Sequence, residues 1–398
     1  MLNPRIATLP PSAFMRLDAL TDGVAPPAAI EVIDMSVGDP RNPPPAIAGD
    51  ILYEQRALFG RYASPRGTPE FRAAVGDWIG RHYGLPEGMI DPERHVLPVA
   101  GLKEGMFLIA LAVVPERKAG AAPAVLIPNP FYHPYAGAAV GARAEAVFVN
   151  ASAENRFLPD FAGLDEATLA RAAMAYLCSP ANPQGVAADI DYLCRLIELA
   201  RARDFVLVVD ECYAELYTGA RPAGALEACA RLGGNLSNLL VFHSLSKRSN
   251  LPGLRSGFVA GDPDILSQYL KLRNYGAVAM PLPVQAASAA LWRDAAHVAE
   301  TRAFYIRNVD AAARILGNRF GFYRPDGGMF LWLDVGDGVT AARRLWSEAG
   351  VKVMPGAFMT RDIPGSETVG APYIRVALVH DFATTGEGLA RLSETLGA

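Results

Sequence analysis

The stretch Ala175–Glu211 reads AYLCSPANPQGVAADIDYLCRLIELARARDFVLVVDE. Short apolar runs stand at its two ends, and between them Ile190, Leu193, Cys194 and Ile197 follow the i, i+3, i+4, i+7 spacing of a helix with one apolar face. We interpret this stretch as a strand, a helix and a second strand. Such a unit predicts a parallel sheet that is covered by helices.

Similar apolar runs flank this unit on both sides. AVLIPNP (124–130) precedes it and LLVFHS (239–244) follows it, so a mostly parallel sheet should occupy the middle of the chain. The first residues are rich in proline, whereas helices alternate with the runs MFLWLDV and YIRVALV near the other end. We therefore predict an α/β fold with a large domain at residues 46–284 and a smaller α+β domain built from residues 1–45 and 285–398.

Composition excludes several classes of protein. The net charge of −4 and the absence of runs of like charge argue against nucleic-acid binding. The N-terminal sequence lacks the features of a secretory signal, and the longest uncharged window is too polar for a membrane helix, so we expect a cytoplasmic protein. The four cysteines do not have C-x-x-C spacing, which predicts free thiols and no metal site. Small molecules are the expected partners.

Polar side chains follow three of the predicted strands. Active sites of open parallel sheets lie at the carboxyl ends of the strands. The residues at these ends are Ser179 and Asn182, Asp210 and Tyr213, and Ser244, Ser246 and Lys247. An acid directly after a run as apolar as FVLVV is costly to bury unless it meets a cation or hydrogen-bond donors. An amide, an acid with a phenol, and a lysine at three junctions therefore indicate a functional site rather than three separate helix caps.

The segment VFHSLSKRSNLPGLRSG (241–257) contains S-x-S-K followed by G-x-R-x-G. Together with NPQG, DECY and YIR in the same order and spacing, it resembles the class I and II aminotransferases, which are pyridoxal-phosphate enzymes of fold type I. The resemblance extends from SVGDP near residue 38 to YIRVAL near residue 375. It implies pyridoxal 5′-phosphate as cofactor, amino acids and 2-oxo acids as substrates, and a homodimer with active sites at the subunit interface.

The resemblance also implies roles for the residues around the cofactor ring. Lys247 should condense with the cofactor aldehyde and later move a proton as general base and acid. Asp210 should pair with the pyridine nitrogen, which keeps the ring able to accept electrons. Asn182 and Tyr213 should donate hydrogen bonds to the ring oxygen, and Tyr132 should stack on the ring.

The cofactor phosphate requires fixed donors, which a helix N-terminus supplies through its backbone N–H groups and its dipole. In PVAGLKEGMFLIAL (98–111), a turn at Gly101 should open a helix whose first amides belong to about Leu102 and Lys103. Leu102 stands where much of the family has a hydroxyl residue, so one phosphate contact should be missing. The other phosphate-binding residues that the resemblance implies are Ser244, Arg255 and, from a neighbouring subunit, Tyr62. Ser246 is a further predicted cofactor-binding residue.

The substrate should be bound mainly by Arg375. The resemblance implies that this arginine binds the α-carboxylate, with help from Asn182 and the backbone of Gly38. An unpaired charge inside the run YIRVAL would otherwise be expensive. RPDGGMFLWLDV resembles the glycine-rich substrate wall of the family, with Gly328 allowing close approach. Three arginines are candidates for binding the distal part of the substrate: Arg41, Arg248 and Arg273.

Within the family, SLSKRSNLPGLRSGFVAGD (244–262) and NYGAVAMPLPVQAASAALW (274–292) closely resemble the N-succinyldiaminopimelate aminotransferases of bacterial lysine biosynthesis, which use glutamate as amino donor. Aspartate, alanine and aromatic amino acids are rival substrates. A fold type I lyase that acts on sulfur amino acids would share the cofactor site and remains open.

Two other readings are weaker. S-x-x-K also occurs in penicillin-recognising acyl transferases, but no S-D-N or K-T-G follows, and Ser244 is predicted to end a strand rather than open a helix. A non-catalytic cofactor-binding module fused to a regulator would require a DNA-binding domain. No basic segment long enough to form a helix-turn-helix precedes residue 40.

Overall fold

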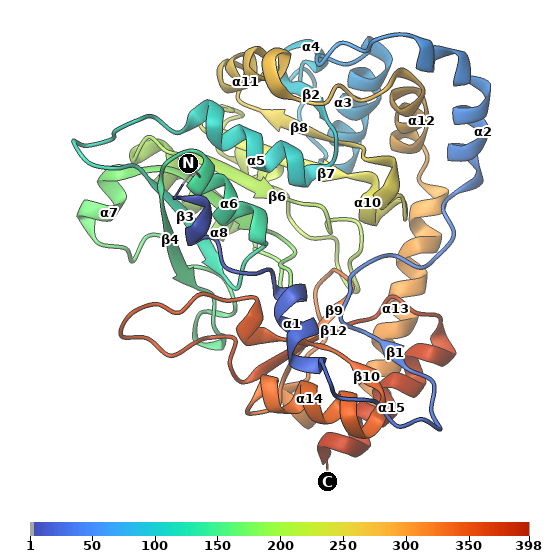
Figure 1. Ribbon diagram of the computed structural model, residues 1–398. Helices are drawn as coiled ribbons and strands as arrows, with labels where there is room; N and C mark the ends of the chain where they lie inside the picture. Colours follow the sequence, from blue (N-terminus) through green and yellow to red (C-terminus); the bar gives the residue numbers. More distant parts are fainter. Residues whose placement is uncertain (1–3, 398) are drawn as a thin grey trace.

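A computed structural model of the protein describes residues 4–397 and arranges them around one large and two small β-sheets (Figure 1). The large sheet has the strand order β2-β8-β7-β6-β5-β3-β4. Its strands are β2 (Val96–Val99), β3 (Ala124–Asn129), β4 (Glu145–Asn150), β5 (Ala172–Cys178), β6 (Val206–Asp210), β7 (Leu239–Ser244) and β8 (Gly257–Gly261). Strands β4, β3, β5, β6 and β7 are parallel, whereas β8 is antiparallel to both β7 and β2. The predicted mostly parallel sheet is confirmed.

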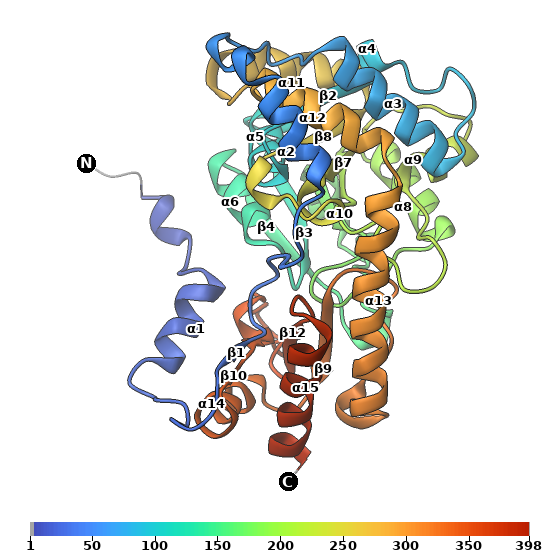
Figure 2. The same ribbon diagram turned by 90° about the vertical axis from the view of Figure 1, so that its right-hand side faces the viewer.

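Helices cover both faces of this sheet (Figures 1 and 2). Along β5, Ala175 and Leu177 belong to one core and Met174 and Tyr176 to the other, as expected for side chains that alternate across a strand. The first core lies under α3 (Pro69–Tyr83), α8 (Ile190–Ala202), α9 (Ala225–Arg231) and α12 (Leu282–Arg293). The second lies under α5 (Leu102–Val113), α6 (His133–Gly141) and α11 (Pro263–Gly276). The helix predicted between the two strands of the opening stretch is α8.

Both ends of the chain build a smaller unit beside the large sheet. In Figure 2 the N-terminal segment lies beside the C-terminal helices. The two are joined where β1 (Ile33–Asp34) pairs in parallel with β10 (Val351–Lys352). The antiparallel sheet consists of β9 (Phe330–Asp334), β11 (Met354–Pro355) and β12 (Tyr373–Ala377). The helices around it are α1 (Ala13–Thr21), α13 (Ala296–Leu316), α14 (Gly338–Ala349) and α15 (Phe382–Gly397).

Short elements complete the described chain. The remaining α-helices are α2 (Ala46–Glu54), α4 (Pro92–His95), α7 (Glu166–Arg171) and α10 (Leu245–Arg248). The 3₁₀ turns are η1 (Ile6–Thr8), η2 (Arg56–Gly60), η3 (Ala153–Asn155), η4 (Pro252–Leu254), η5 (Arg319–Gly321) and η6 (Gly356–Phe358). Between residues 4 and 397 no helix is both long and apolar enough to cross a membrane.

Helix α12 lies at the predicted domain boundary. The boundary after residue 284 falls inside α12, which packs against α2 and α3. The long helix α13 then leads down into the smaller unit (Figure 2). The division at residues 46–284 stays a prediction, and the contacts of α12 favour a boundary between α12 and α13.

Candidate active site

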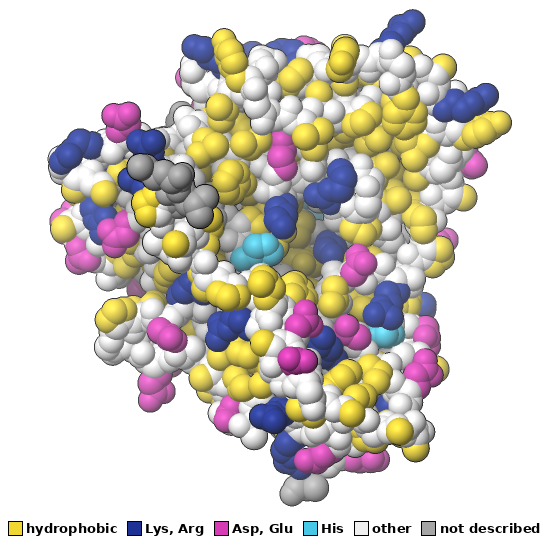
Figure 3. All heavy atoms as spheres, viewed as in Figure 1, with side chains coloured by type: hydrophobic (Ala, Val, Ile, Leu, Met, Phe, Trp, Pro, Cys, Tyr) yellow, Lys and Arg dark blue, Asp and Glu magenta, His cyan; other side chains and the backbone are white. Residues whose placement is uncertain are grey.

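A cavity of about 940 Å³ lies between the large sheet and the smaller unit. Its walls include residues at the carboxyl ends of the parallel strands and residues of β9 and β12. Figure 3 shows a hollow near the centre of this face, with Lys or Arg and His side chains around it. The predicted site residues that line the cavity are Gly38, Leu102, Lys103, Tyr132, Asn182, Asp210, Tyr213, Ser244, Ser246, Lys247, Arg255 and Arg375.

Lys247 is carried by α10, directly after β7. Ser244 ends β7 and also caps α10, because its Oγ accepts a hydrogen bond from the backbone N–H of Ser246 (2.9 Å). The expectation that Ser244 does not open a helix is therefore wrong. Lys247 Nζ donates a hydrogen bond to the carbonyl of Gly38. Burial lowers the pKa of the Lys247 amine, so its neutral, nucleophilic form exists at lower pH than in an exposed lysine.

Asp210 is a buried acid at the end of β6, only 4% exposed. Its Oδ2 accepts a hydrogen bond from Tyr135 Oη (2.9 Å), and its Oδ1 accepts one from the backbone N–H of Cys212 (3.2 Å). Burial raises the pKa of Asp210, while these hydrogen bonds lower it. None of the described cations forms an ion pair with Asp210. The site therefore suits a ligand that brings its own positive charge to this carboxylate.

Arg375 is a buried cation on β12, 5% exposed. Its Nη1 donates to Asn182 Oδ1 (3.2 Å) and its Nη2 to the carbonyl of Ser36 (2.6 Å), but its Nε has no partner within the described chain. Its guanidinium lies over the ring of Phe330, 4.4 Å from the centroid. Burial lowers the pKa of Arg375 to about 10, so it remains charged at neutral pH. A buried arginine that no acid neutralises suits an anionic ligand.

The turn before α5 forms a cradle with Arg255. Gly101 has φ +82°, and a Cβ at this position would lie 2.1 Å from Arg255 Nη2. Arg255 Nη1 donates to the carbonyl of Pro252 (2.7 Å), which holds the guanidinium beside the turn. The first turn of α5, Ser244 and Arg255 all reach the same cavity. A helix N-terminus beside an arginine is an arrangement that binds phosphate.

Residues 30–392 match the family model for aminotransferase class I and II. The chain belongs to this family. Class I and II aminotransferases depend on pyridoxal phosphate, so the predicted family, fold type and cofactor are confirmed. The cradle at Gly101, the buried amine of Lys247 and the unneutralised Asp210 fit this cofactor, because they offer a phosphate site, a nucleophile and a partner for a protonated ring nitrogen.

Three known proteins illustrate the relationship. The crystal structure of an aminotransferase from Neisseria meningitidis superimposes with a TM-score of 0.94 at 36% identity, over 99% of each chain. An LL-diaminopimelate aminotransferase of Moorella thermoacetica is 30% identical over 99% of this chain and 98% of its own. A probable N-succinyldiaminopimelate aminotransferase from Thermus thermophilus has a TM-score of 0.83 at 24% identity, over 96% of this chain and 100% of its own, and shares the fold.

Several residues of this aminotransferase lie elsewhere than predicted. Arg41 is exposed and does not line the cavity. Arg273 is buried on α11 and does not line the cavity, and its charge is paired with Glu104 (3.2 Å), which does. Gly328 does not line the cavity, and a Cβ there would meet only ordinary contacts. The close approach instead occurs at Gly327, whose Cβ would lie 2.7 Å from Pro180.

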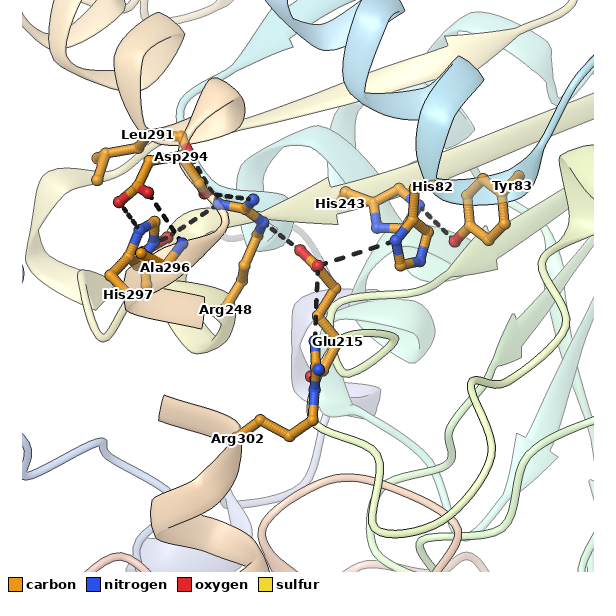
Figure 4. A network of polar contacts seen from close by, with 11 residues as sticks. His82, Tyr83, Glu215, His243, Arg248, Leu291, Asp294, Ala296, His297 and Arg302 are labelled. Carbon is orange, nitrogen blue, oxygen red and sulfur yellow. Dashed lines mark hydrogen bonds and ion pairs between the residues drawn. The ribbon is translucent and has the colours of Figure 1, made fainter. Parts of the chain in front are cut away.

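Arg248 follows Lys247 but belongs to a buried polar network (Figure 4). It pairs with Glu215, donates to the carbonyl of Leu291 (2.8 Å), and its guanidinium lies 4.8 Å from the ring of Trp292. The prediction that Arg248 binds the distal part of the substrate is wrong, because its charge is already paired inside the protein. The network instead anchors α10, which carries Lys247.

Three residues of the aminotransferase site were not predicted from the sequence. Tyr135 follows Tyr132 by three residues in NPFYHPY, a spacing that could have indicated a shared face at the start of α6. The two rings are 5.7 Å apart. Cys212 follows the DE of DECY, yet a thiol carries no signal of its own. Arg361 also lines the cavity, and nothing in the local sequence marks it.

Proposed function

We propose that this aminotransferase moves an amino group between glutamate and N-succinyl-2-amino-6-oxopimelate in the cytoplasmic synthesis of diaminopimelate and lysine. The observation that carries the amino-transfer chemistry is the presence of half-buried Lys247 and buried Asp210 and Arg375 in one cavity. The substrate is supported by the likeness of residues 244–262 and 274–292 to that group of enzymes. It is also supported by relatives named LL-diaminopimelate aminotransferase.

Each residue around the ring has a proposed task. When bound, pyridoxal phosphate supplies an aldehyde and a ring that stabilises negative charge on the substrate. Lys247 Nζ would hold the cofactor through its aldehyde carbon and would, as general base, take the proton from the substrate α-carbon. Asp210 would stay ionised and hold the ring nitrogen protonated. Tyr132 would stack on the ring, and Tyr213, with Asn182, would donate hydrogen bonds to the ring oxygen.

The ends of the ligands are held by other groups. Arg375, together with Asn182 and the backbone of Gly38, positions the α-carboxylate of either substrate, so one arginine serves both half-reactions. Because its guanidinium is buried and charged, it binds carboxylate in a setting of low dielectric. The phosphate is held by Gly101, the amides of Leu102 and Lys103, Ser244, Ser246, Arg255 and, from the second subunit of a homodimer, Tyr62.

The experiment compares kcat/KM for amino donors with 2-oxoglutarate as acceptor. N-succinyl-LL-diaminopimelate should exceed aspartate, alanine and phenylalanine by on the order of 100-fold, because a site built for distal polar groups rejects substrates that leave those groups unpaired. Free LL-diaminopimelate is the matched control for the succinyl group. A preference for aspartate or phenylalanine removes the proposed substrate, whereas release of pyruvate and ammonia from a sulfur amino acid as the main reaction indicates a lyase.

Borohydride reduction tests the chemistry separately from the substrate. It should fix the cofactor to the peptide that contains Lys247. Lys247→Ala should still bind the cofactor but lose turnover by several orders of magnitude, since both the nucleophile and a proton-transfer group worth roughly 10²–10⁴-fold are removed. A purified protein that binds no pyridoxal phosphate contradicts the whole assignment.

A further inference from the structure

Arg361 lines the same cavity as Arg375 but comes from a different segment, the loop that follows η6. The side chain of Asn129 forms hydrogen bonds with both the backbone N–H and the backbone carbonyl of Arg361. Asn129 Oδ1 accepts a hydrogen bond from the Arg361 N–H (2.9 Å), and Asn129 Nδ2 donates one to the Arg361 carbonyl (2.9 Å). Asn129 ends β3 and is 1% exposed. A loop of the smaller unit is thereby fixed to the carboxyl end of a strand of the large sheet.

The side chain of Arg361 lies on the wall of the cavity. Its guanidinium is 5.3 Å from the centroid of the Phe131 ring, and the residue is half-buried. Among residues 4–397, no aspartate or glutamate forms an ion pair with it. The adjacent acid, Asp362, accepts a hydrogen bond from Thr368, and its charge acts on Arg361 only by raising the pKa of that arginine. Arg361 therefore presents a positive charge to the cavity.

A second arginine strengthens the positive charge of this region. Burial lowers the pKa of Arg361, and the charge of Arg16 lowers it further. Arg16 is held in place because it donates to the carbonyl of Ala357 (3.3 Å) and lies 4.2 Å from the ring centroid of Phe358. The charges of Arg16 and Arg361 repel each other. An anion bound beside Arg361 at the cavity wall would reduce this repulsion.

The other cations that line the cavity are placed for other tasks. Lys247 donates to the carbonyl of Gly38, Arg375 is bound to Asn182, and Arg255 is held beside Gly101. Lys103 is exposed in the first turn of α5, next to the phosphate cradle. Arg361 thus lines the cavity without a task in the proposed reaction at the α-carbon.

We propose that Arg361 determines substrate specificity by binding a carboxylate at the distal end of the substrate while Arg375 binds the α-carboxylate. This inference rests on the proposed aminotransferase function and names its substrate class: amino acids and 2-oxo acids with a second carboxylate several bonds from the reacting carbon. The guanidinium offers paired N–H donors that match a carboxylate. The cavity volume of about 940 Å³ lies within the range of roughly 300–1,000 Å³ that accommodates long ligands.

A binding experiment tests the proposal without turnover. Calorimetry on the cofactor-loaded protein compares linear dicarboxylates from pentanedioate to nonanedioate with monocarboxylates of equal chain length. At one or more lengths the wild-type protein should bind the dicarboxylate about 10- to 100-fold more tightly, the usual effect of one charge-assisted hydrogen-bonded pair. Arg361→Gln should abolish this difference, and Arg361→Lys should retain part of it.

Arg343→Gln is the matched control, because it removes the same charge from an exposed position on α14 that does not line the cavity. Arg343→Gln should still bind dicarboxylates more tightly than monocarboxylates, as the wild type does. The proposal is overturned if no dicarboxylate is preferred by the wild-type protein, or if Arg361→Gln binds dicarboxylates as tightly as the wild type does.

Kinetics of the first half-reaction provide a second readout, followed by cofactor absorbance so that no oxo-acid acceptor is needed. Arg361→Gln should lower kcat/KM for 2-aminopimelate by at least about tenfold, mainly through KM, and leave 2-aminoheptanoate within about twofold. An equal loss for both donors would mean a structural role and would refute the inference. If the wild type rejects N-succinyl-LL-diaminopimelate but shows the Arg361 effect with 2-aminopimelate, only the proposed substrate fails.

Discussion

Asp210 and Tyr135 illustrate how single residues set the chemistry of the site. Asp210 must stay ionised in a buried position, where its pKa is raised by loss of water. The hydroxyl of Tyr135 stabilises the ionised form by donating to Oδ2 at 2.9 Å. Tyr135 is itself buried and stacks on Tyr176 at 4.3 Å, so its hydroxyl has little freedom to leave this position.

Tyr135→Phe should therefore raise the pKa of Asp210 and lower kcat about tenfold, which corresponds to the roughly 1.5 kcal/mol of a hydrogen bond to a charged group. The acid limb of the profile of kcat against pH should move to higher pH, because the carboxylate then becomes protonated sooner as the pH falls. Tyr176→Phe is the control, since it removes a buried hydroxyl that donates to the carbonyl of Met106 and not to Asp210. Equal shifts of the profile in the two variants would contradict the role of Tyr135.

Among the secondary-structure elements, the turn between β2 and α5 depends on a single glycine. Gly101→Ala combines an unfavourable φ of +82° with a Cβ that overlaps Arg255. Displacing that guanidinium should weaken pyridoxal phosphate binding by about tenfold or more, as overpacking costs roughly 1–3 kcal/mol. Titration of the cofactor-free protein with pyridoxal phosphate measures the change.

Gly120→Ala is the matched control for this turn. Gly120 has φ +75°, but a Cβ there meets nothing within 4 Å and the residue does not line the cavity. Gly120→Ala therefore has the same unfavourable positive φ as Gly101→Ala, but its Cβ overlaps no other residue. Equal losses of cofactor affinity in the two variants would show that general strain, and not displacement of Arg255, is responsible.

The last turn of α3 makes stability dependent on pH through His82 (Figure 4). Burial, and then the nearby His243, lower the pKa of His82 to about 3. The unfolded chain therefore binds a proton below pH about 6.5 that the folded protein does not, so stability falls as the pH falls from about 6.5 towards 3. This contribution to stability is fully present above pH 6.5.

Urea unfolding of wild type and His82→Asn at pH 6.5 and 5.0 isolates this effect. Between pH 6.5 and 5.0 the free energy of unfolding of the wild type should fall by about 2 kcal/mol more than that of the variant. One bound proton changes this free energy by about 1.4 kcal/mol per pH unit. Both proteins are measured at one concentration and with cofactor bound, because binding and assembly also change stability. If the free energy of unfolding falls equally in both proteins, His82 is not the cause of the pH dependence.

At the scale of the whole molecule, two of the segments that expose large apolar side chains bear on assembly. Tyr53, Phe59 and Tyr62 are 68%, 58% and 106% exposed, and Tyr275 and Val278 are 86% and 63% exposed. Exposed apolar patches of this kind mark protein interfaces. These segments support the proposed homodimer, in which Tyr62 reaches the phosphate site of the second subunit.

Tyr62→Phe should weaken cofactor binding about tenfold, or roughly 1–2 kcal/mol, the effect of one hydrogen bond to a charged group. Sedimentation should show that the variant is still a dimer. Tyr53→Phe, which removes another exposed hydroxyl of the same surface, should leave cofactor binding unchanged. A wild-type protein that is strictly monomeric and fully active at assay concentration would refute the shared site.

Much of the fold and of the site follows from local patterns in the chain. The periodicity at Ile190–Ala202 and the apolar runs beside it predict a helix between two strands, because one apolar face or a continuous apolar run must be buried whatever surrounds it. Parallel strands end at the same edge, so Asp210 and Lys247 were expected together. The motif around Lys247 assigned its partners by resemblance, and the cavity contains most of them.

Only the tertiary structure decides which charges are paired. Arg248 and Arg361 both have polar neighbours in the sequence. Arg248 nevertheless pairs with Glu215 and donates to the carbonyl of Leu291, 43 residues away, while Arg361 lines the cavity and forms no ion pair with an acid of residues 4–397. Arg273 is likewise neutralised by Glu104, 169 residues away. A side chain's partners depend on packing between distant segments, and the free energy of burying a charge depends on those partners. Local pattern therefore determined the elements and the reacting residues, and long-range packing determined which arginine is free to bind a substrate.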